Sequence, residues 1–315
     1  MVAEQTVLIE LLTLRGHVLG RVADYERAAQ QAELLVLRAP DEWAALLERT
    51  RTRATLHRYS EALLDLDAAE RCGCDSNTLN AELAAILQAV GYSENALILR
   101  LKAAEQRPTY STLAALAVLH GERREIAEAE RLFGQAQQEY QEVSPFPVAA
   151  LDFRRGLMWY KESDLGAARR MFDAARRRVP AYAPAIGYLA KVEAALGIHD
   201  EAIARLRPLA QSSDDPRYAA NLSAILCDAG RVEEDDLWRT RAAQRYDQIL
   251  LSHPQSFNRD AAHFWATVGG NPRRGRRLAL RDAATGAADR AYVMARVLIT
   301  RRSESTASQD LLGYG

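Results

Sequence analysis

Small and apolar side chains recur along the chain with the spacing of one helix face. Between residues 163 and 180, Ala168, Phe172 and Ala175 stand at i, i+4 and i+7, and Pro180 follows shortly afterwards. The five arginines of this stretch mostly occupy the remaining faces. This pattern predicts a helix that buries its small residues and leaves its arginines in solvent, rather than a helix that reads nucleic acid.

The same skeleton recurs at a spacing of about 34 residues. One small residue marks each unit, at spacings of 34, 34, 33, 39 and 34: Ala28, Ala62, Ala96, Ala129, Ala168 and Ala202. Twelve residues earlier stands a second small residue: Gly16, Thr50, Ala84, Ala117, Gly156 and Ala190. Two antiparallel helices approach closely where small side chains meet. The pattern therefore predicts six consecutive helix pairs, with 142–147 as a loop insert.

The pattern becomes irregular in the last third of the chain. Asp235 stands where a seventh small residue is expected, and the helix that follows is predicted to run long, as far as Pro254. An eighth unit spans 260–284 with its turn at 269–272, and 290–302 would form a separate closing helix. We therefore divide the chain into a regular array (1–216), irregular repeats with a capping helix (217–302) and a disordered tail (303–315).

These units resemble tetratricopeptide repeats. The resemblance rests on the 34-residue period and on a Tyr-x-x-Ala step with a closing proline, seen best as Tyr25, Ala28 and Pro40. It covers about residues 9–300. It implies an all-α fold, a right-handed α-solenoid of about seven to eight helix pairs. It also implies a non-enzymatic scaffold or adaptor that binds a peptide or protein segment in its concave groove.

Composition narrows the classes of partner. Hydrophobic residues make up 48% of the chain and charged residues 26%, with a formal net charge of −1. Such a balance gives no general attraction to nucleic acid, so none is expected as a partner. No apolar run reaches the roughly 18 residues of a membrane helix, and the first residues do not read as a signal peptide. We expect a cytoplasmic protein without membrane insertion; the oligomeric state stays open.

The sequence carries no recognisable catalytic or cofactor motif. Phosphate loops, zinc-protease motifs and nucleophile elbows are absent. Cys72 and Cys74 have no second ligand pair at zinc spacing, so we expect no metal. The glycines around the "RRGRR" segment (273–277) belong to an expected turn between helices, which we favour over a phosphate site. We therefore predict no enzymatic activity and no cofactor.

The first helices of repeats five to seven offer a candidate binding groove. In the family that the chain resembles, certain first-helix positions face the groove, and the register transfers them here to Phe153, Arg154, Leu157, Tyr160, Lys161, Tyr188, Lys191, Arg217 and Asn221. Aromatic and cationic side chains of this kind favour a peptide or protein partner of acidic character. The alternative is that Tyr160 and Tyr188 only pack between helices.

Repeats one and two place Glu10, His17, Arg21, Glu48 and Arg51 at the same groove positions. Some proteins with this repeat hold a chaperone's C-terminal carboxylate in a basic clamp. Here Gly187, Phe257 and Ala261 replace clamp residues, so that role is not expected. Two further functions stay open: a peptide-sensing regulator, and an accessory subunit of an enzyme or biosynthetic pathway.

Overall fold

The computed structural model describes the backbone of residues 2–312 and the side chains of residues 2–292. Over this range the chain is a succession of α-helices joined by short turns, without a β-strand. The helices are α1 (Val2–Leu19), α2 (Val22–Arg38), α3 (Trp43–Thr55), α4 (Tyr59–Arg71), α5 (Ser76–Ala89), α6 (Ser93–Gln106), α7 (Tyr110–Glu122), α8 (Ile126–Glu139), α9 (Phe146–Lys161), α10 (Leu165–Arg178), α11 (Ala183–Ala195), α12 (His199–Ser212), α13 (Pro216–Asp228), α14 (Val232–Ser252), α15 (Pro254–Ala266) and α16 (Pro272–Leu312).

Consecutive helices pack as antiparallel pairs, as the repeat predicts. The six marker alanines are all at most 1% exposed, so each lies inside a helix crossing. At one such crossing, between α9 and α10, a methyl group added to Gly156 would come within 2.6 Å of the Phe172 ring. The small residues of the pattern are therefore needed because the two backbones approach too closely for larger ones.

Short polar side chains and prolines fix where several helices begin. The Asp75 carboxylate accepts hydrogen bonds from the backbone N–H groups of Asn77 and Thr78 at the start of α5. Asp164 likewise accepts from the Ala167 N–H at the start of α10. Prolines stand in the first turns of α9, α11, α13 and α15, where a missing N–H costs no helical hydrogen bond.

The seventh pair accommodates its unusual Asp235 through a buried hydrogen bond. Asp235 is 4% exposed, and the Ser223 hydroxyl donates to its carboxylate at 2.5 Å across the crossing of α13 and α14. Arg239 contributes an ion pair to the same carboxylate at 3.4 Å. A bonded pair thus fills the position that small side chains hold in the other repeats. The second helix, α14, extends to Ser252, as expected.

The last helix differs from the sequence prediction. The turn between α15 and α16 falls at 267–271, which agrees with the expected unit. The separate closing helix predicted over 290–302 is wrong, because α16 runs without interruption from Pro272 through this segment. No glycine or proline between 290 and 302 breaks the helical hydrogen bonds. The side chains of the predicted tail (303–315) lie outside the described residues, and its disorder stays a prediction.

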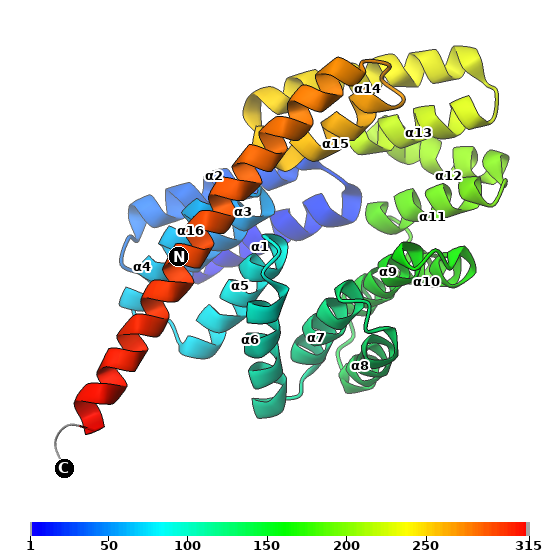
Figure 1. Ribbon diagram of the computed structural model, residues 1–315. Coiled ribbons are helices and arrows are strands. Elements are labelled where there is room, and N and C mark those ends of the chain that lie inside the picture. The colour runs from blue at the N-terminus through cyan, green and yellow to red at the C-terminus, as the bar shows by residue number, and fades with distance from the viewer. Residues whose placement is uncertain (1, 313–315) are drawn as a thin grey trace.

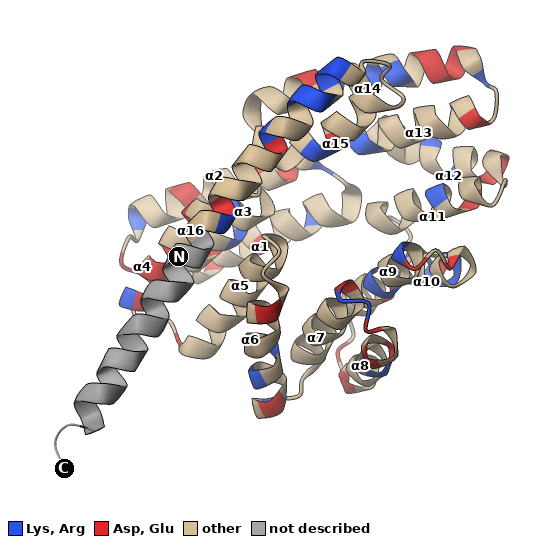
Figure 2. Cartoon of the chain, viewed as in Figure 1, with Lys and Arg blue, Asp and Glu red and all other residues tan. Residues whose placement is uncertain are grey.

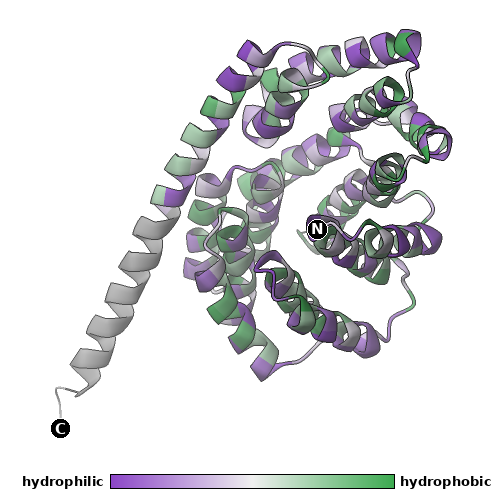
Figure 3. Cartoon of the chain, turned by 45° about the vertical axis from the view of Figure 1, so that its right-hand side comes forward, coloured by the Kyte–Doolittle hydropathy of each residue, from purple (hydrophilic) through white to green (hydrophobic). Residues whose placement is uncertain are grey.

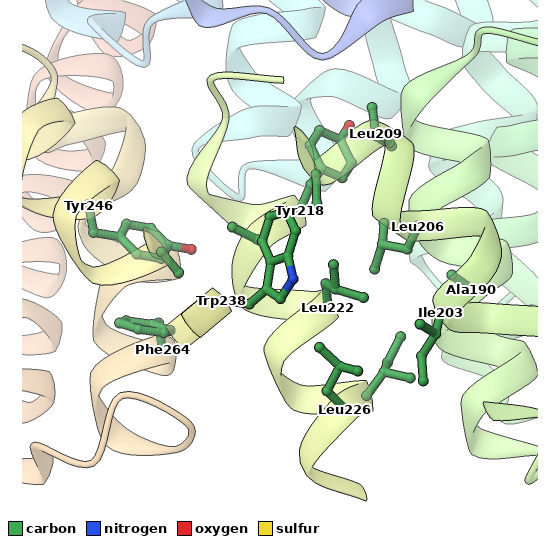
Figure 4. Packing of buried hydrophobic residues seen from close by; sticks show 14 of the residues in the cluster. Ala190, Ile203, Leu206, Leu209, Tyr218, Leu222, Leu226, Trp238, Tyr246 and Phe264 are labelled. Atoms are coloured by element: carbon green, nitrogen blue, oxygen red, sulfur yellow. The ribbon is translucent and has the colours of Figure 1, made fainter. Parts of the chain in front are cut away.

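The helix pairs wind around until the two ends of the array meet. Figure 1 shows the first helices (blue) beside the last ones (orange), and the turned view in Figure 3 shows the pairs arranged around a common centre. The α1 helix contacts α11, and α16 contacts α4. A large core cluster, which includes Leu222, Trp238 and Phe264, joins α11–α12 to α13–α16 (Figure 4). This core is therefore continuous across residue 216, where the sequence predicts the boundary between the regular array and the irregular repeats.

Candidate ligand-binding cavity

A cavity of about 390 Å³ lies on the inner side of the array. Side chains from α9, α11, α13 and α15 form one part of its wall. The α1–α2 hairpin forms another part, through His17, Gly20 and Tyr25. Residues separated by more than 200 positions thus line one space, because the ends of the solenoid meet there.

Seven of the nine residues proposed for the groove line this cavity. They are Phe153, Arg154, Leu157, Tyr188, Lys191, Arg217 and Asn221. Tyr160 and Lys161 do not line it. The Tyr160 ring packs edge-to-face on Tyr188 with centroids 5.6 Å apart, and the Lys161 side chain is exposed near the end of α9.

Tyr188 both packs and lines the cavity. Its ring lies 5.6 Å from the Phe153 ring and 5.4 Å from the Phe172 ring, between centroids. Burial raises the pKa of its hydroxyl. The first contact is edge-to-face and the second is tilted, and together they fix the ring orientation. Tyr188 therefore fits both alternatives that the sequence left open, lining the groove and packing between helices. Among the described contacts, Tyr160 only packs.

Arg217 is held by carboxylates that sequence reasoning missed. Its guanidinium is 2.5 Å from Asp215 and 3.6 Å from Asp260, and it lies over the Phe257 ring. Burial lowers the pKa of Arg217, but the two carboxylates outweigh burial and hold the pKa well above its ordinary value. The cation is therefore engaged within the protein.

The other two cations of the cavity have no acidic partner within ion-pair distance among the described residues. The Lys191 ammonium lies 5.2 Å from the centre of the Tyr188 ring, and burial lowers its pKa. Arg154 is an exposed residue on α9, and its charge acts on His17 and Tyr182. An anion that entered the cavity would find both groups available.

His17 is uncharged at neutral pH. Burial, together with the positive charges of Arg154 and Arg217, lowers its pKa to about 4. Its Nε2 lies 2.9 Å from the Tyr182 hydroxyl, a hydrogen bond between α1 and the start of α11. The groove register of the first repeat placed His17 correctly on the inner side of the array.

Polar contacts hold the first hairpin against the later repeats. The Asp214 carboxylate accepts hydrogen bonds from the backbone N–H groups of Val22 (2.7 Å) and Ala23 (2.9 Å), which begin α2. The Ser213 hydroxyl donates to the Gly20 carbonyl oxygen. We call these contacts of Ser213 and Asp214 with residues 20–23 the latch. Gly20, one of the latch residues, also lines the cavity.

The latch region requires a glycine at position 20. Gly20 has φ +62°, a left-handed conformation that favours glycine, and an added methyl group would lie 2.6 Å from the Tyr218 ring. Tyr218 also fills the space against Gly187, where an added methyl group would lie 2.9 Å away. A clamp lysine at position 187 would collide with this ring. No signal in the local sequence pattern revealed Tyr218, Asp215 or Asp260 as cavity residues.

Of the groove residues of the first two repeats, His17 lines the cavity, whereas Glu10, Glu48 and Arg51 form an ion-pair network away from it. Arg51 is 2.7 Å from both Glu48 and Glu82, and 3.5 Å from Glu10. Arg21 precedes the first residue of α2. The candidate site therefore has its charged groups in repeats five to eight.

The arginine-rich helix α10 has its charges largely compensated. Arg176 and Arg177 both pair with Asp173, at 2.8 and 2.6 Å, and Arg178 pairs with Asp152 at 2.8 Å. Figure 2 shows basic and acidic residues interspersed along the helices. Such pairing supports the interpretation of α10 as a solvated outer face.

A second hollow of about 520 Å³ lies between α14, α15 and the start of α16. Arg274, Arg277 and Arg281 line it together with Leu250 and other apolar side chains. Arg274 pairs with Asp247 and stacks on Trp265. The "RRGRR" segment thus contributes one packed arginine and several exposed ones.

The described residues contain no cluster of histidine, cysteine and acidic groups suited to a metal ion. Cys72, Cys74 and Cys227 are free thiols, and Cys74 is buried. In the same part of the chain, no helix is both long and apolar enough to cross a membrane.

Comparison with solved structures identifies the fold. A tetratricopeptide repeat protein from Parabacteroides merdae is 15% identical, with a TM-score of 0.49 over 75% of this chain and 93% of that chain. The APC/C hetero-tetramer Cut9–Hcn1 is 15% identical, with a TM-score of 0.53 over 75% and 52%. The human IFIT1 dimer with PPP-AAAA is 17% identical, with a TM-score of 0.50 over 84% and 69%.

No family model matches the chain, and no curated protein matches its sequence. At such low identity, the structural likeness shows the fold alone. The chain is an α-solenoid of tetratricopeptide-like helix pairs.

Proposed function

We propose that the protein is a non-enzymatic interaction scaffold that binds a segment of a partner protein in the inner cavity. One observation carries this proposal: Arg154 and Lys191 face a cavity with aromatic walls and have no acidic ion-pair partner among the described residues. Aromatic rings supply contact area at low entropic cost, and cations orient an acidic group. A partner segment of acidic character supplies both kinds of contact.

The size of the cavity favours a second candidate. A volume of about 390 Å³ lies within the ~300–1,000 Å³ range of small-molecule sites. An accessory subunit that holds an anionic compound for another enzyme would use the same groups. The human IFIT1 dimer was solved with PPP-AAAA, so phosphate-bearing ligands belong in the test.

Co-purification separates these candidates. Tagged wild-type protein is recovered from cell extract after nuclease treatment, and bound proteins and small molecules are identified by mass spectrometry. The scaffold proposal expects a protein that is retained by wild type and lost from Tyr188→Ala/Lys191→Ala. Lys161→Ala, which alters an exposed lysine outside the cavity, serves as the control and should retain that protein. Recovery of a small anion without a protein partner would favour the accessory subunit.

A further inference from the structure

The hollow between α14, α15 and the start of α16 is a space apart from the inner cavity. Its volume of about 520 Å³ lies within the ~300–1,000 Å³ range of small-molecule sites. Among the described residues, none lines both spaces. Gly275 lets α16 approach α15 here, because an added methyl group would lie 2.8 Å from the Ala262 carbonyl oxygen. This close contact holds the α16 wall of the hollow in place against α15.

The acidic groups beside this hollow are already paired. Asp247, which lines it, pairs with Arg274 of α16. Asp282 of α16 pairs with Arg259 of α15 at 3.2 Å. The Arg274 guanidinium also lies over the Trp265 ring, 4.1 Å from its centre. Both carboxylates therefore have their charge compensated within the protein, and Arg274 is held in place.

Two further arginines of α16 line the hollow with uncompensated charge. Arg277 and Arg281 are exposed, and neither forms an ion pair with a described residue. They stand four residues apart, on the same face of the helix, where like charges repel each other. Figure 2 shows basic residues along the first turns of α16. An anion bound between the two guanidinium groups would relieve this repulsion.

The same hollow contains a buried amide and apolar walls. Asn258 lines it from α15, is 4% exposed, and its side chain makes no hydrogen bond to another described residue. A buried amide without a partner is unfavourable, and it can both donate to and accept from a ligand. Leu250, Leu251 and Leu278 supply apolar surface. The hollow therefore combines cations near solvent, apolar walls and a polar group in its interior.

We propose that this hollow binds a small amphipathic anion. Arg277 and Arg281 bind its carboxylate or phosphate head group, and the three leucines contact its apolar body. Asn258 forms a hydrogen bond with a hydroxyl or carbonyl group on that body. This site goes beyond the function proposed for the inner cavity and does not depend on it.

Isothermal titration calorimetry of the full chain with octanoate and with octyl phosphate tests the inference. Both anions should bind, whereas octanol and octylammonium should not, because they lack the negative charge. Acetate should bind at least tenfold more weakly than octanoate, and inorganic phosphate at least tenfold more weakly than octyl phosphate, because both lack the apolar body. The stronger of the two octyl anions identifies the head group that the arginines prefer.

Variants show whether the named residues form the site. Arg277→Gln/Arg281→Gln should weaken binding of the octyl anions at least tenfold. Arg273→Gln/Arg276→Gln is the matched control, because it removes two exposed arginines of the same segment that do not line the hollow. This control should bind as wild type does, and circular dichroism should show equal helicity in all variants.

The role of Asn258 has its own test. 8-Hydroxyoctanoate should bind wild type more tightly than octanoate does, and Asn258→Leu should abolish this difference. Equal affinities of the two acids for wild type would contradict the hydrogen bond to Asn258.

The inner-cavity variant Tyr188→Ala/Lys191→Ala should bind the octyl anions as wild type does, which separates this inference from the proposed function. Loss of binding in that variant would place the anion in the inner cavity and overturn the inference. Failure of both octyl anions to bind, equal binding of octanol or octylammonium, or equal losses in the two double-arginine variants would overturn it as well.

Discussion

At the scale of single residues, the repeat depends on the small side chains at the helix crossings. Ala168 is fully buried between α9 and α10, so Ala168→Glu would place an unpaired charge in a site without water. We expect this change to lower the free energy of unfolding by at least about 3 kcal/mol. Denaturant unfolding measures it, with Ala85→Glu on the exposed side of α5 as the control. A melting temperature within a degree of wild type would show that the register of repeat five is wrong.

His17 should give the protein part of its sensitivity to acid. Its folded-state pKa of about 4 lies below its ordinary value of 6.5, so the unfolded state binds more protons between these two pH values. The stability that neutral His17 provides is therefore present above pH 6.5 and is lost as the pH falls toward 4. His17→Gln removes this titration. The stability gap between wild type and His17→Gln should narrow over that window, as measured by unfolding at a series of pH values. A constant gap would contradict the assignment.

The candidate site was predictable only where its residues follow the repeat register. Tyr188 and Lys191 stand at groove positions of a first helix, and the register alone places them on the inner side. Asp215 begins the next helix as its capping residue, and its second role toward Arg217 depends on side-chain geometry. Tyr218 lies in the cavity because it meets Gly20, almost 200 residues away in sequence. No local pattern contains that contact.

At the scale of helices, the latch between the first hairpin and the α12–α13 turn should hold the array closed. Asp214→Ala removes two hydrogen bonds to the start of α2. Loss of a side chain that caps a helix costs about 0.5–2 kcal/mol. We expect a loss of stability in this range and a larger radius of gyration, measured by unfolding and by X-ray scattering in solution.

The exposed Asp228, at the end of α13, offers a matched control for the latch. Asp228→Ala should leave both the stability and the radius of gyration at wild-type values. If Asp214→Ala behaves like this control, the first hairpin is held by its other contacts, such as the hydrogen bond between His17 and Tyr182.

Most helices were predictable because each contains its own boundary signals. Proline and aspartate begin α13, and Gly197 with its positive φ follows α11. The end of the chain lacked such signals. No proline follows Pro272, and Gly286 does not interrupt α16, so the predicted closing helix became part of it.

At the scale of the whole molecule, the meeting of the two ends turns an open groove into a cavity. The sequence predicts the number of repeats but not this meeting, because small rotations between successive pairs accumulate along the array. The contacts of His253 with Glu26 and of Ser60 with Asp289 form only because these rotations add up to bring the two ends together. In the function proposed above, partner binding is therefore coupled to the packing of the first hairpin through the same space.

The affinity of the captured partner for the cavity variant tests this account most directly. The partner is titrated into wild type, Tyr188→Ala/Lys191→Ala and the exposed-site control Lys161→Ala, with helicity checked by circular dichroism. Losses at binding hot spots exceed about 1 kcal/mol each, so the double variant should raise Kd by roughly tenfold or more. The control should bind like wild type, and all three proteins should be equally helical. An unchanged Kd for a fully helical double variant would place the partner site outside the cavity.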